Sequence, residues 1–309
     1  MALKPDRALC ADQLAALQAM LRAWGTATFV GAMFWVLKKT DDDKKVDDDS
    51  APTRLVPFIL NAVQRHLLAN LAQHNILEKA RQIGGTTFFL LIRGLMSVIT
   101  AEGTNALLIA QSKDFADAHF LAANRAIRMF GMIDPRADEI VNAVNTSYRQ
   151  NLLHTKYMNK RELYFDMLES RMTVASAEVE EAAQGPTLHA LIASEYSRWP
   201  HKPAATLANA RGALVKHTGT LDIECTCNGA AGSFYEKCLL ANNAPDLSDA
   251  KFHFYEWFLT EEYVTPLTQK QKDELEKDIT ADELRFIELA HAKLSEAAWV
   301  GIKRDRIFV

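Results

Sequence analysis

The sequence predicts an α/β fold in which a largely parallel β-sheet is flanked by helices. Short apolar runs of strand length recur along the chain, and segments with helical periodicity separate most of them. A glycine pair also joins an early strand candidate to a long apolar helix. No internal repeat is visible, which excludes solenoids and propellers.

The composition is that of an ordinary globular protein, with 49% apolar and 24% charged residues. The net charge of -4 argues against a uniformly basic nucleic-acid-binding protein, but it leaves a local basic surface open. The 4 cysteines are too few for a disulfide framework, which fits a reducing compartment. The early apolar run Gly25–Leu37 is too short to span a membrane, so we expect neither secretion nor a membrane anchor.

The N-terminal segment, residues 1–50, is predicted to be a helical region followed by a linker. Residues Ala11–Leu37 have a mostly helical composition, and Asp41–Ser50 is a run of charged residues typical of a solvated loop. A predicted core domain, residues 51–266, follows. It begins with helical spacing over Ile59–Ala72.

Two strand–helix units come next. A strand at Ile76–Ala80 precedes a Gly84-Gly85 turn and a helix over Thr86–Thr100. A second strand at Asn105–Gln111 leads into a helix at Ser112–Phe130. These units favour parallel strands with helical crossovers.

A predicted β-hairpin follows, formed by Leu163–Phe165 and Arg171–Ala175 with a turn near Glu169-Ser170. The other strand candidates are His189–Ala193, Leu221–Thr226 and Phe252–Trp257. The tail from Thr268 to Ile307 has charged, helical periodicity and no strand signal. Residues 267–309 are therefore predicted to form a small helical subdomain.

The segment between the first strand and its helix has the features of an anion site. Backbone N–H groups and the helix dipole favour phosphate at such a turn. The usual P-loop pattern is Gly, four residues, then Gly-Lys-Ser/Thr, and this chain has Gly84 and Thr86 but Gly85 in place of the lysine. Taken alone, the pattern also fits a simple glycine turn.

The neighbouring residues strengthen the phosphate interpretation. Lys79, followed by Arg81-Gln82-x-Gly-x-Thr-Thr, resembles the Walker A motif of large terminase subunits of tailed phages. Upstream, Pro57–Gln64 resembles that family's Pro-Phe-x-Leu-Asn-x-x-Gln segment, in which the glutamine helps to hold adenine. The resemblance implies that Lys79 or Arg81 supplies the phosphate-binding cation. The nucleotide-binding residues that it implies are Gln64, Lys79, Arg81, Gln82, Gly84, Gly85, Thr86 and Thr87.

The segment Leu191–Glu195 resembles the family's Walker B motif, four apolar residues followed by Asp-Glu or Ser-Glu. The resemblance implies that Glu195 orients and deprotonates the attacking water, together with Arg81 and Thr226 as catalytic residues. Thr86 is expected to bind Mg²⁺ directly and Ser194 through water. Without the resemblance, a surface glutamate is the favoured interpretation of Glu195.

A third motif, with Thr226 near the Asn228-Gly229 turn, resembles the strand-Ser/Thr-x-x-Asn-Gly motif that couples hydrolysis to movement. Its alternative interpretation is a strand that ends in a turn. Further on, the aromatic segment Phe254–Phe258 resembles a Trp-Phe motif and is expected to pack in the core. The residues Leu294–Arg304 resemble the helix that ends the family's ATPase half.

Three positions depart from the family pattern: Gly85, Ser194 and Gln184. Many family members have an arginine at the position of Gln184, and in some of them that arginine reaches a neighbouring subunit's phosphates. Arg198 and Arg211 are candidates for that role here. No set of acidic nuclease ligands follows Tyr263, so we expect the motor half alone, without nuclease activity.

The resemblance implies a RecA-like (ASCE) P-loop NTPase that uses ATP and Mg²⁺ to move double-stranded DNA into a procapsid in the host cytoplasm. The expected partners are the portal protein, the small terminase subunit and further copies in a pentameric ring, although a lone domain can be monomeric. Two alternatives remain open at this stage. One is a nucleotide-binding assembly module with little hydrolysis, and the other is a helicase-like DNA-dependent ATPase.

Overall fold

The computed structural model describes residues 7–39, 53–131, 146–159, 161–179, 186–226, 228–259 and 268–294. The predicted charged linker, Gln184 and the residues after Leu294 lie outside these ranges. The helices are α1 (Arg7–Met33), α2 (Ala62–Asn70), α3 (Gly85–Phe89), the π-helix η2 (Leu90–Leu95), α4 (Met96–Ile99), α5 (Lys113–Arg128), α7 (Pro203–Gly212), α8 (Gly232–Asn243), α9 (Gln269–Asp278) and α10 (Ala281–Leu294). Short 3₁₀ turns are η4 (Tyr196–Arg198), η5 (Pro245–Leu247) and η6 (Trp257–Leu259).

A mostly parallel sheet forms the centre of the molecule. Its 8 strands follow the order β10-β3-β9-β8-β4-β7-β6-β5. The strands from β10 to β7 run parallel, and β6 and β5 add to one edge in antiparallel pairing. The strand bounds are β3 (His74–Lys79), β4 (Asn105–Ala110), β5 (Thr155–Asn159), β6 (Glu162–Phe165), β7 (Ser170–Ser176), β8 (Ala190–Ser194), β9 (Thr220–Thr226) and β10 (Lys251–Tyr255). The predicted α/β fold class is confirmed.

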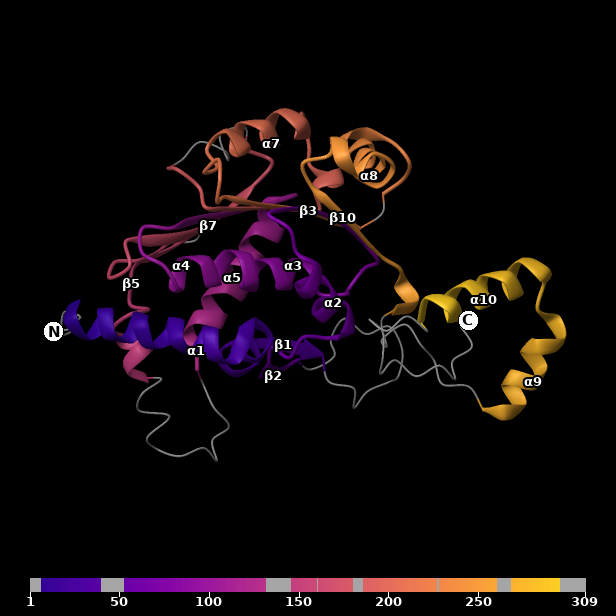
Figure 1. The fold of residues 1–309 in the computed structure, drawn as a ribbon, viewed down its shortest axis with the longest axis horizontal. Coiled ribbons are helices and arrows are strands. Elements are labelled where there is room, and N and C mark those ends of the chain that lie inside the picture. The colour runs from indigo at the N-terminus through magenta and orange to yellow at the C-terminus, as the bar shows by residue number, and fades with distance from the viewer. Residues whose placement is uncertain are drawn as a thin grey trace.

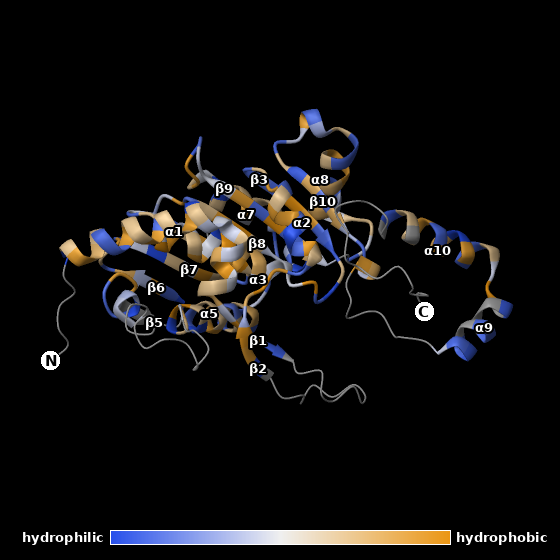
Figure 2. Ribbon diagram, turned by 60° about the horizontal axis from the view of Figure 1, so that its bottom comes forward, coloured by the Kyte–Doolittle hydropathy of each residue, from blue (hydrophilic) through white to orange (hydrophobic). Residues whose placement is uncertain are grey.

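Helices cover both faces of this sheet: α1 to α5 lie on one face, and α7 and α8 on the other (Figure 1). Successive strand residues point to opposite faces. Leu108 and Ile192 therefore enter the core beneath α1 to α5, whereas Leu107 and Leu191 enter the core beneath α7 and α8. Figure 2 shows the corresponding concentration of apolar residues in the central strands. Burial on both faces explains why these strands are continuous apolar runs in the sequence.

The N-terminal segment differs from its prediction. Helix α1 ends at Met33, with a kink at Gly25, and Trp35–Lys39 forms strand β1. Strand β1 pairs with β2 (Thr53–Pro57) in an antiparallel two-stranded sheet. Phe29 and Val30 of α1 are buried in the same core as α2 and α3. The predicted division at residue 50 thus runs between two paired strands, and the division into domains stays a prediction.

Near the predicted glycine turn, the elements form close to their expected places. Asn61 caps α2, since its side chain accepts a hydrogen bond from the N–H of Gln64 at 2.8 Å. After β3, the helical path α3-η2-α4 continues from Gly85 to Ile99. The hairpin of β6 and β7 is confirmed, whereas β5 was not predicted from the sequence.

A buried polar network lies near the amino ends of β3 and β9, away from the glycine turn. Asn75 donates from Nδ2 to Asp222 Oδ1 at 2.7 Å, and Arg93 Nε lies 3.3 Å from Asp222 Oδ2. His253 Nε2, on β10, lies 3.0 Å from Asn75 Oδ1. These contacts connect three neighbouring strands to the π-helix, through hydrogen bonds at Asn75 and an ion pair between Arg93 and Asp222.

The C-terminal helices α9 and α10 agree with the predicted helical tail. Phe286 of α10 stacks on Trp257, with ring centroids 6.2 Å apart, and meets Phe258 edge-on at 5.8 Å. The aromatic segment therefore packs against α10. Among the described helices, none combines the length and the apolar character that crossing a bilayer requires.

Candidate functional site

The glycine turn has a geometry suited to phosphate. Strand β3 ends at Lys79, and the chain turns through Gln82 and Gly84, both with positive φ (59° and 76°), before α3 begins. Only glycine adopts such a φ without strain. A Cβ on Gly84 would also lie 2.6 Å from Gln64 Nε2, so glycine is needed for space as well. The turn directs the first N–H groups of the α3-η2-α4 helix into a pocket at the carboxyl edge of the sheet.

Gln64 supports this turn from behind. It is 4% exposed, and its Nε2 donates to the Gly84 carbonyl at 3.1 Å. Its Oε1 accepts from the Asn61 N–H at 3.1 Å, and Asn61 Nδ2 donates to the Ile83 carbonyl at 3.3 Å. Both ends of the Gln64 amide are thus used within the protein. Its expected contact with adenine stays a prediction.

The side chain of Lys79 passes over Gly85. A Cβ on Gly85 would lie 2.8 Å from Lys79 Cδ and 3.0 Å from Leu77 Cδ2. A side chain at position 85 and the present course of Lys79 therefore exclude one another. The absence of a lysine at position 85 and the presence of Lys79 are therefore linked. The ammonium group enters the cavity from the end of β3 instead of from the start of α3.

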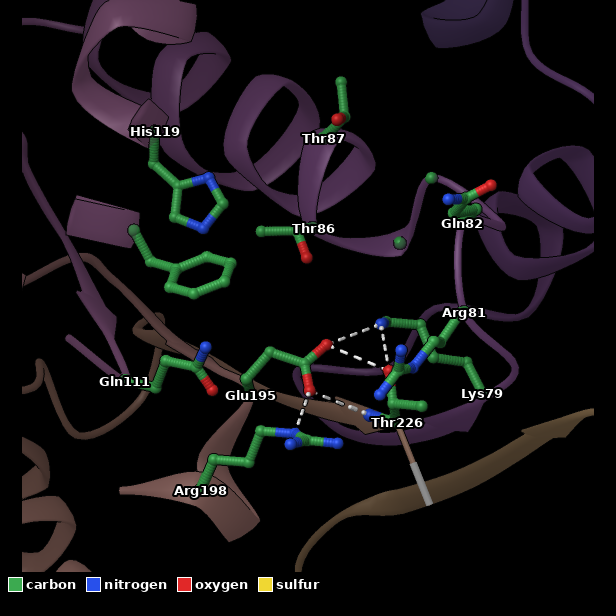
Figure 3. Close-up of a pocket in the computed structure, with 13 residues that line it drawn as sticks. Lys79, Arg81, Gln82, Thr86, Thr87, Gln111, His119, Glu195, Arg198 and Thr226 are labelled. Carbon is green, nitrogen blue, oxygen red and sulfur yellow. Dashed lines mark hydrogen bonds and ion pairs between the residues drawn. The ribbon is translucent and has the colours of Figure 1, made fainter. Parts of the chain in front are cut away.

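A cavity of about 560 Å³ opens in front of the turn. This volume is in the range of sites for small ligands and cofactors. Its lining residues are Lys79, Arg81, Gln82, Gly84, Gly85, Thr86, Thr87, Gln111, Phe115, His119, Glu195, Arg198 and Thr226. Figure 3 shows Lys79, Thr226 and Arg198 around Glu195, with Thr86 and His119 facing them across the cavity, whereas Thr87 points away from this group. Of the predicted nucleotide-binding, catalytic and metal-binding residues, all but Gln64 and Ser194 line this cavity, and of the two candidate arginines only Arg198 does.

Glu195 lies at the centre of a hydrogen-bonded cluster. It follows β8 directly, in a left-handed conformation with φ 49°, and its Oε1 lies 3.1 Å from Lys79 Nζ. The Thr226 hydroxyl donates to Oε1 at 3.0 Å and the Thr226 N–H to Oε2 at 3.3 Å. Arg198 Nε lies 3.5 Å from Oε2. The strained φ of a non-glycine residue in a cavity is typical of a functional site.

The charges of this cluster are mutually dependent. Burial opposes ionisation of Glu195, but the charge of Lys79 and the hydrogen bonds from Lys79 and Thr226 outweigh it, so the pKa of Glu195 is lowered. Burial likewise opposes the charged form of Lys79, but Glu224 and Glu195 outweigh it and raise the pKa of the ammonium. Both groups are therefore ionised in the state described.

Glu224 was not predicted as a site residue. It lies on β9, is fully buried and is in register with Ser194 of β8. Its Oε1 accepts hydrogen bonds from the Thr86 hydroxyl at 2.7 Å and the Ser194 hydroxyl at 2.6 Å. Its Oε2 lies 3.0 Å from Lys79 Nζ. The available signal was a glutamate inside an apolar strand, because a buried carboxylate is rare unless it is paired.

Three further lining residues were also missed. Gln111 directly follows β4, and Phe115 and His119 lie one turn apart on α5, with ring centroids 6.5 Å apart. Burial lowers the pKa of His119, which favours the neutral ring. The usable signal was positional, since ligands bind beyond the carboxyl ends of parallel strands.

The oxygen donors fit Mg²⁺ only in combination with phosphate. Thr86 offers a hydroxyl, and Ser194 and Glu224 lie directly behind it. Within the described part of the chain, no three His, Cys, Asp or Glu side chains gather in a group that could hold a metal ion. Mg²⁺ in proteins is commonly held by few protein groups together with substrate phosphates, and these residues suit that mode.

Neither a protein-family model nor a curated protein matches this sequence. Among solved structures, a Thermus phage large terminase ATPase domain matches at 16% identity and a TM-score of 0.44, over 62% of this chain and 79% of that chain. The HK97 bacteriophage large terminase matches at 17% identity and a TM-score of 0.45, over 79% of this chain but 45% of that chain. A Pyrococcus furiosus Hef helicase domain matches at 13% identity and a TM-score of 0.38, over 79% and 48% of the two chains.

This chain thus spans less than half the length of the HK97 protein that it matches. Large terminase ATPase domains from several phages are among its structural neighbours. The glycine turn after β3 and the parallel sheet, with β9 inserted between β3 and β8, agree with the predicted RecA-like P-loop fold.

Proposed function

We propose that this chain is an ATP-hydrolysing motor domain of a viral DNA-packaging terminase. The observation that carries the proposal is the position of Lys79, whose ammonium lies in the phosphate pocket within 3.1 Å of Glu195. A cation for the phosphates and a carboxylate for water are thus adjacent, although the usual P-loop lysine is absent. The order of the sequence motifs supports the terminase assignment.

In the proposed mechanism, the turn from Arg81 to Thr87 binds the phosphates through its N–H groups. Lys79 and Arg81 add positive charge from the strand side of the cavity. Thr86 holds Mg²⁺, which when bound neutralises charge on the phosphate oxygens. Because phosphoryl transfer depends mainly on positioning and charge, these groups supply much of the catalysis.

Glu195 is the proposed base that orients the attacking water. In the state described, its oxygens are engaged by Lys79 and Thr226. When Lys79 turns toward the phosphates, Glu195 loses its nearest cation, its pKa rises and one oxygen becomes able to accept from water. Lys79 therefore links nucleotide binding to activation of the base.

Thr226 is the proposed coupling residue. It contacts Glu195 through both its hydroxyl and its N–H, and it ends β9, shortly before α8 begins at Gly232. If Glu195 shifts on hydrolysis, its hydrogen bonds to Thr226 therefore transmit the shift to the start of α8. We propose that this path moves the surface that grips double-stranded DNA.

The assembled motor is proposed from the sequence resemblance. It would be a pentameric ring in the host cytoplasm that acts with the portal and the small terminase subunit. Arg198 lines the cavity of its own subunit, next to Glu195. Arg211 does not line it and instead forms an ion pair with Asp249. Of the two, Arg198 is therefore the better candidate for a catalytic arginine, acting within its own subunit.

The test is Mg²⁺-dependent ATP hydrolysis, with and without double-stranded DNA, by the chain and by Glu195→Gln. We expect DNA-stimulated turnover that Glu195→Gln reduces by a factor of about 10² to 10⁴ while nucleotide binding persists. Turnover no higher than that of Glu195→Gln, alone and with portal, would favour a non-hydrolysing assembly module. Strand separation with a forked duplex would instead favour a helicase-like enzyme.

A further inference from the structure

The proposed site has an acid in an unexpected place. The position next to the catalytic glutamate on β8, where the family pattern often has an aspartate, is Ser194. A buried carboxylate is nevertheless present, because Glu224 of the neighbouring strand accepts from the Ser194 hydroxyl at 2.6 Å. We propose that Glu224 is the metal-positioning acid of this site, so that β9 supplies the charge that β8 lacks. This inference rests on the proposed function.

The hydrogen bond from Thr86 gives the first argument. A threonine hydroxyl has one proton and two lone pairs. Thr86 donates that proton to Glu224 Oε1 at 2.7 Å, so its lone pairs remain for a cation on the side of the cavity. Glu224 thereby fixes the orientation in which Thr86 can bind Mg²⁺. Such partners behind a metal ligand set both its orientation and its affinity.

The strand register gives the second argument. Ser194 and Glu224 are direct neighbours in the parallel pair of β8 and β9, and adjacent strands lie about 4.8 Å apart. Glutamate has one more methylene than aspartate, and the small serine leaves room for it. The carboxylate of this site therefore comes from β9, one strand away from Ser194. Lys79 and Gly85 show the same kind of exchange, in which a small residue stands where the usual charged one is missing.

Electrostatics gives the third argument. Glu224 is 0% exposed, and Lys79 is the cation that contacts it, at 3.0 Å. If Lys79 turns to the phosphates, as the proposed function requires, a buried carboxylate is left without its counter-ion, which is strongly unfavourable. Glu224 then requires a replacement cation close to Thr86. A divalent ion that enters with the nucleotide meets this requirement.

The first experiment measures metal binding without turnover. Mn²⁺ serves as a paramagnetic substitute for Mg²⁺, and its binding with ADP is followed by electron paramagnetic resonance in the intact chain and in Glu224→Gln. We expect Glu224→Gln to weaken Mn²⁺ binding by about tenfold to a hundredfold. Binding of a fluorescent ADP in EDTA should stay within about twofold, because the glycine turn is intact. Glu78→Gln, a carboxylate change on β3 outside the cavity, is the matched control and should leave both values unchanged.

The second experiment moves the carboxylate between strands. Glu224→Ser should lose the metal-dependent part of nucleotide affinity, and the double variant Ser194→Asp with Glu224→Ser should regain much of it. Circular dichroism identifies variants that do not fold, and Glu224→Asp supplies a second conservative change if Glu224→Gln fails to fold. Unchanged Mn²⁺ affinity in a folded Glu224→Gln or Glu224→Ser variant would overturn the role of Glu224 alone. If the unmodified chain binds no nucleotide, the proposed function itself is wrong.

Discussion

Lys79 and Gly85 occupy one space in this protein, since a Cβ on Gly85 would lie 2.8 Å from Lys79 Cδ. The two residues are on opposite sides of the glycine turn, one at the end of β3 and the other at the start of α3. An ammonium can therefore enter the cavity from the strand or from the helix, but not from both at once. Substitutions at these two positions therefore test whether Lys79 replaces the lysine that is missing at position 85.

Lys79→Ala should reduce ATP hydrolysis by at least about a hundredfold, because a preorganised cation in a catalytic site is worth several kcal/mol. Gly85→Lys alone should also be harmful, because the added side chain overlaps Lys79 and costs about 1–3 kcal/mol of stability. The double variant Lys79→Ala with Gly85→Lys should recover part of the activity. Rates of ATP hydrolysis and thermal unfolding of all three variants measure these changes in activity and stability. Turnover by Lys79→Ala at the wild-type rate would contradict the role of Lys79.

Thr226 should set the position of the acidic limb in the pH–rate profile of ATP hydrolysis. Its hydrogen bonds favour the ionised form of Glu195 and help to lower the pKa of that carboxyl. Thr226→Val removes the hydroxyl bond of 3.0 Å, so the pKa of Glu195 should rise and the acidic limb of the pH–rate profile should move to higher pH. Thr226→Ser, which keeps the hydroxyl, should leave the limb in place. Identical limbs for all three proteins would show that Thr226 does not tune this base.

The central strands could be predicted from the sequence because burial on both faces makes them apolar runs. The N-terminal helix α1 and the short strand β1 that follows it could not be separated in the same way. Trp35–Lys39 becomes a strand by pairing with Thr53–Pro57 across the intervening charged segment, and such pairing is not a local property of either sequence. Thr155–Asn159 was missed for a related reason, since this edge strand mixes polar and apolar residues.

Within the site, the sequence indicated the residues of the glycine turn and Glu195, but it did not indicate Glu224. The family pattern directs attention to the end of β8, and a glutamate on another strand becomes relevant only when the register of β8 and β9 is known. Gln64 illustrates the reverse case. Its place in a motif was recognised, but its hydrogen bonds to Gly84 and Asn61 depend on the packing of α2 behind the turn.

Gln64 should affect nucleotides of every base alike. Gln64→Leu removes its bond to the Gly84 carbonyl and part of the cap of α2, which should cost about 1–2 kcal/mol of stability. The turn then loses support, so the affinities for ATP and GTP should fall by similar factors in titrations of the two nucleotides. A loss confined to ATP would instead favour the direct adenine contact expected from the sequence.

His253 should make the fold sensitive to acid. Burial, with smaller contributions from Lys251 and His66, lowers its pKa from 6.5 to about 4. A histidine that is neutral when folded and charged when unfolded contributes stability that is full above pH 6.5 and falls as the pH drops toward 4. The shift corresponds to at most about 3 kcal/mol. Asp222 acts in the opposite direction, because burial raises its pKa to about 6 and its protonation stabilises the fold as the pH falls.

The two effects are separated by comparing the chain with His253→Gln, which keeps Asp222 and a donor near Asn75 Oδ1 but cannot take up a proton. Urea unfolding near pH 7 and near pH 5 gives the free energy of unfolding of each protein. On acidification, the intact chain should lose more stability than His253→Gln, by about 1–2 kcal/mol over this interval. Equal losses in the two proteins would mean that His253 is protonated as easily in the folded chain as in the unfolded one. In that case Asn75 must be able to accept from a charged ring, and the polar network at the amino ends of β3 and β9 is open to water.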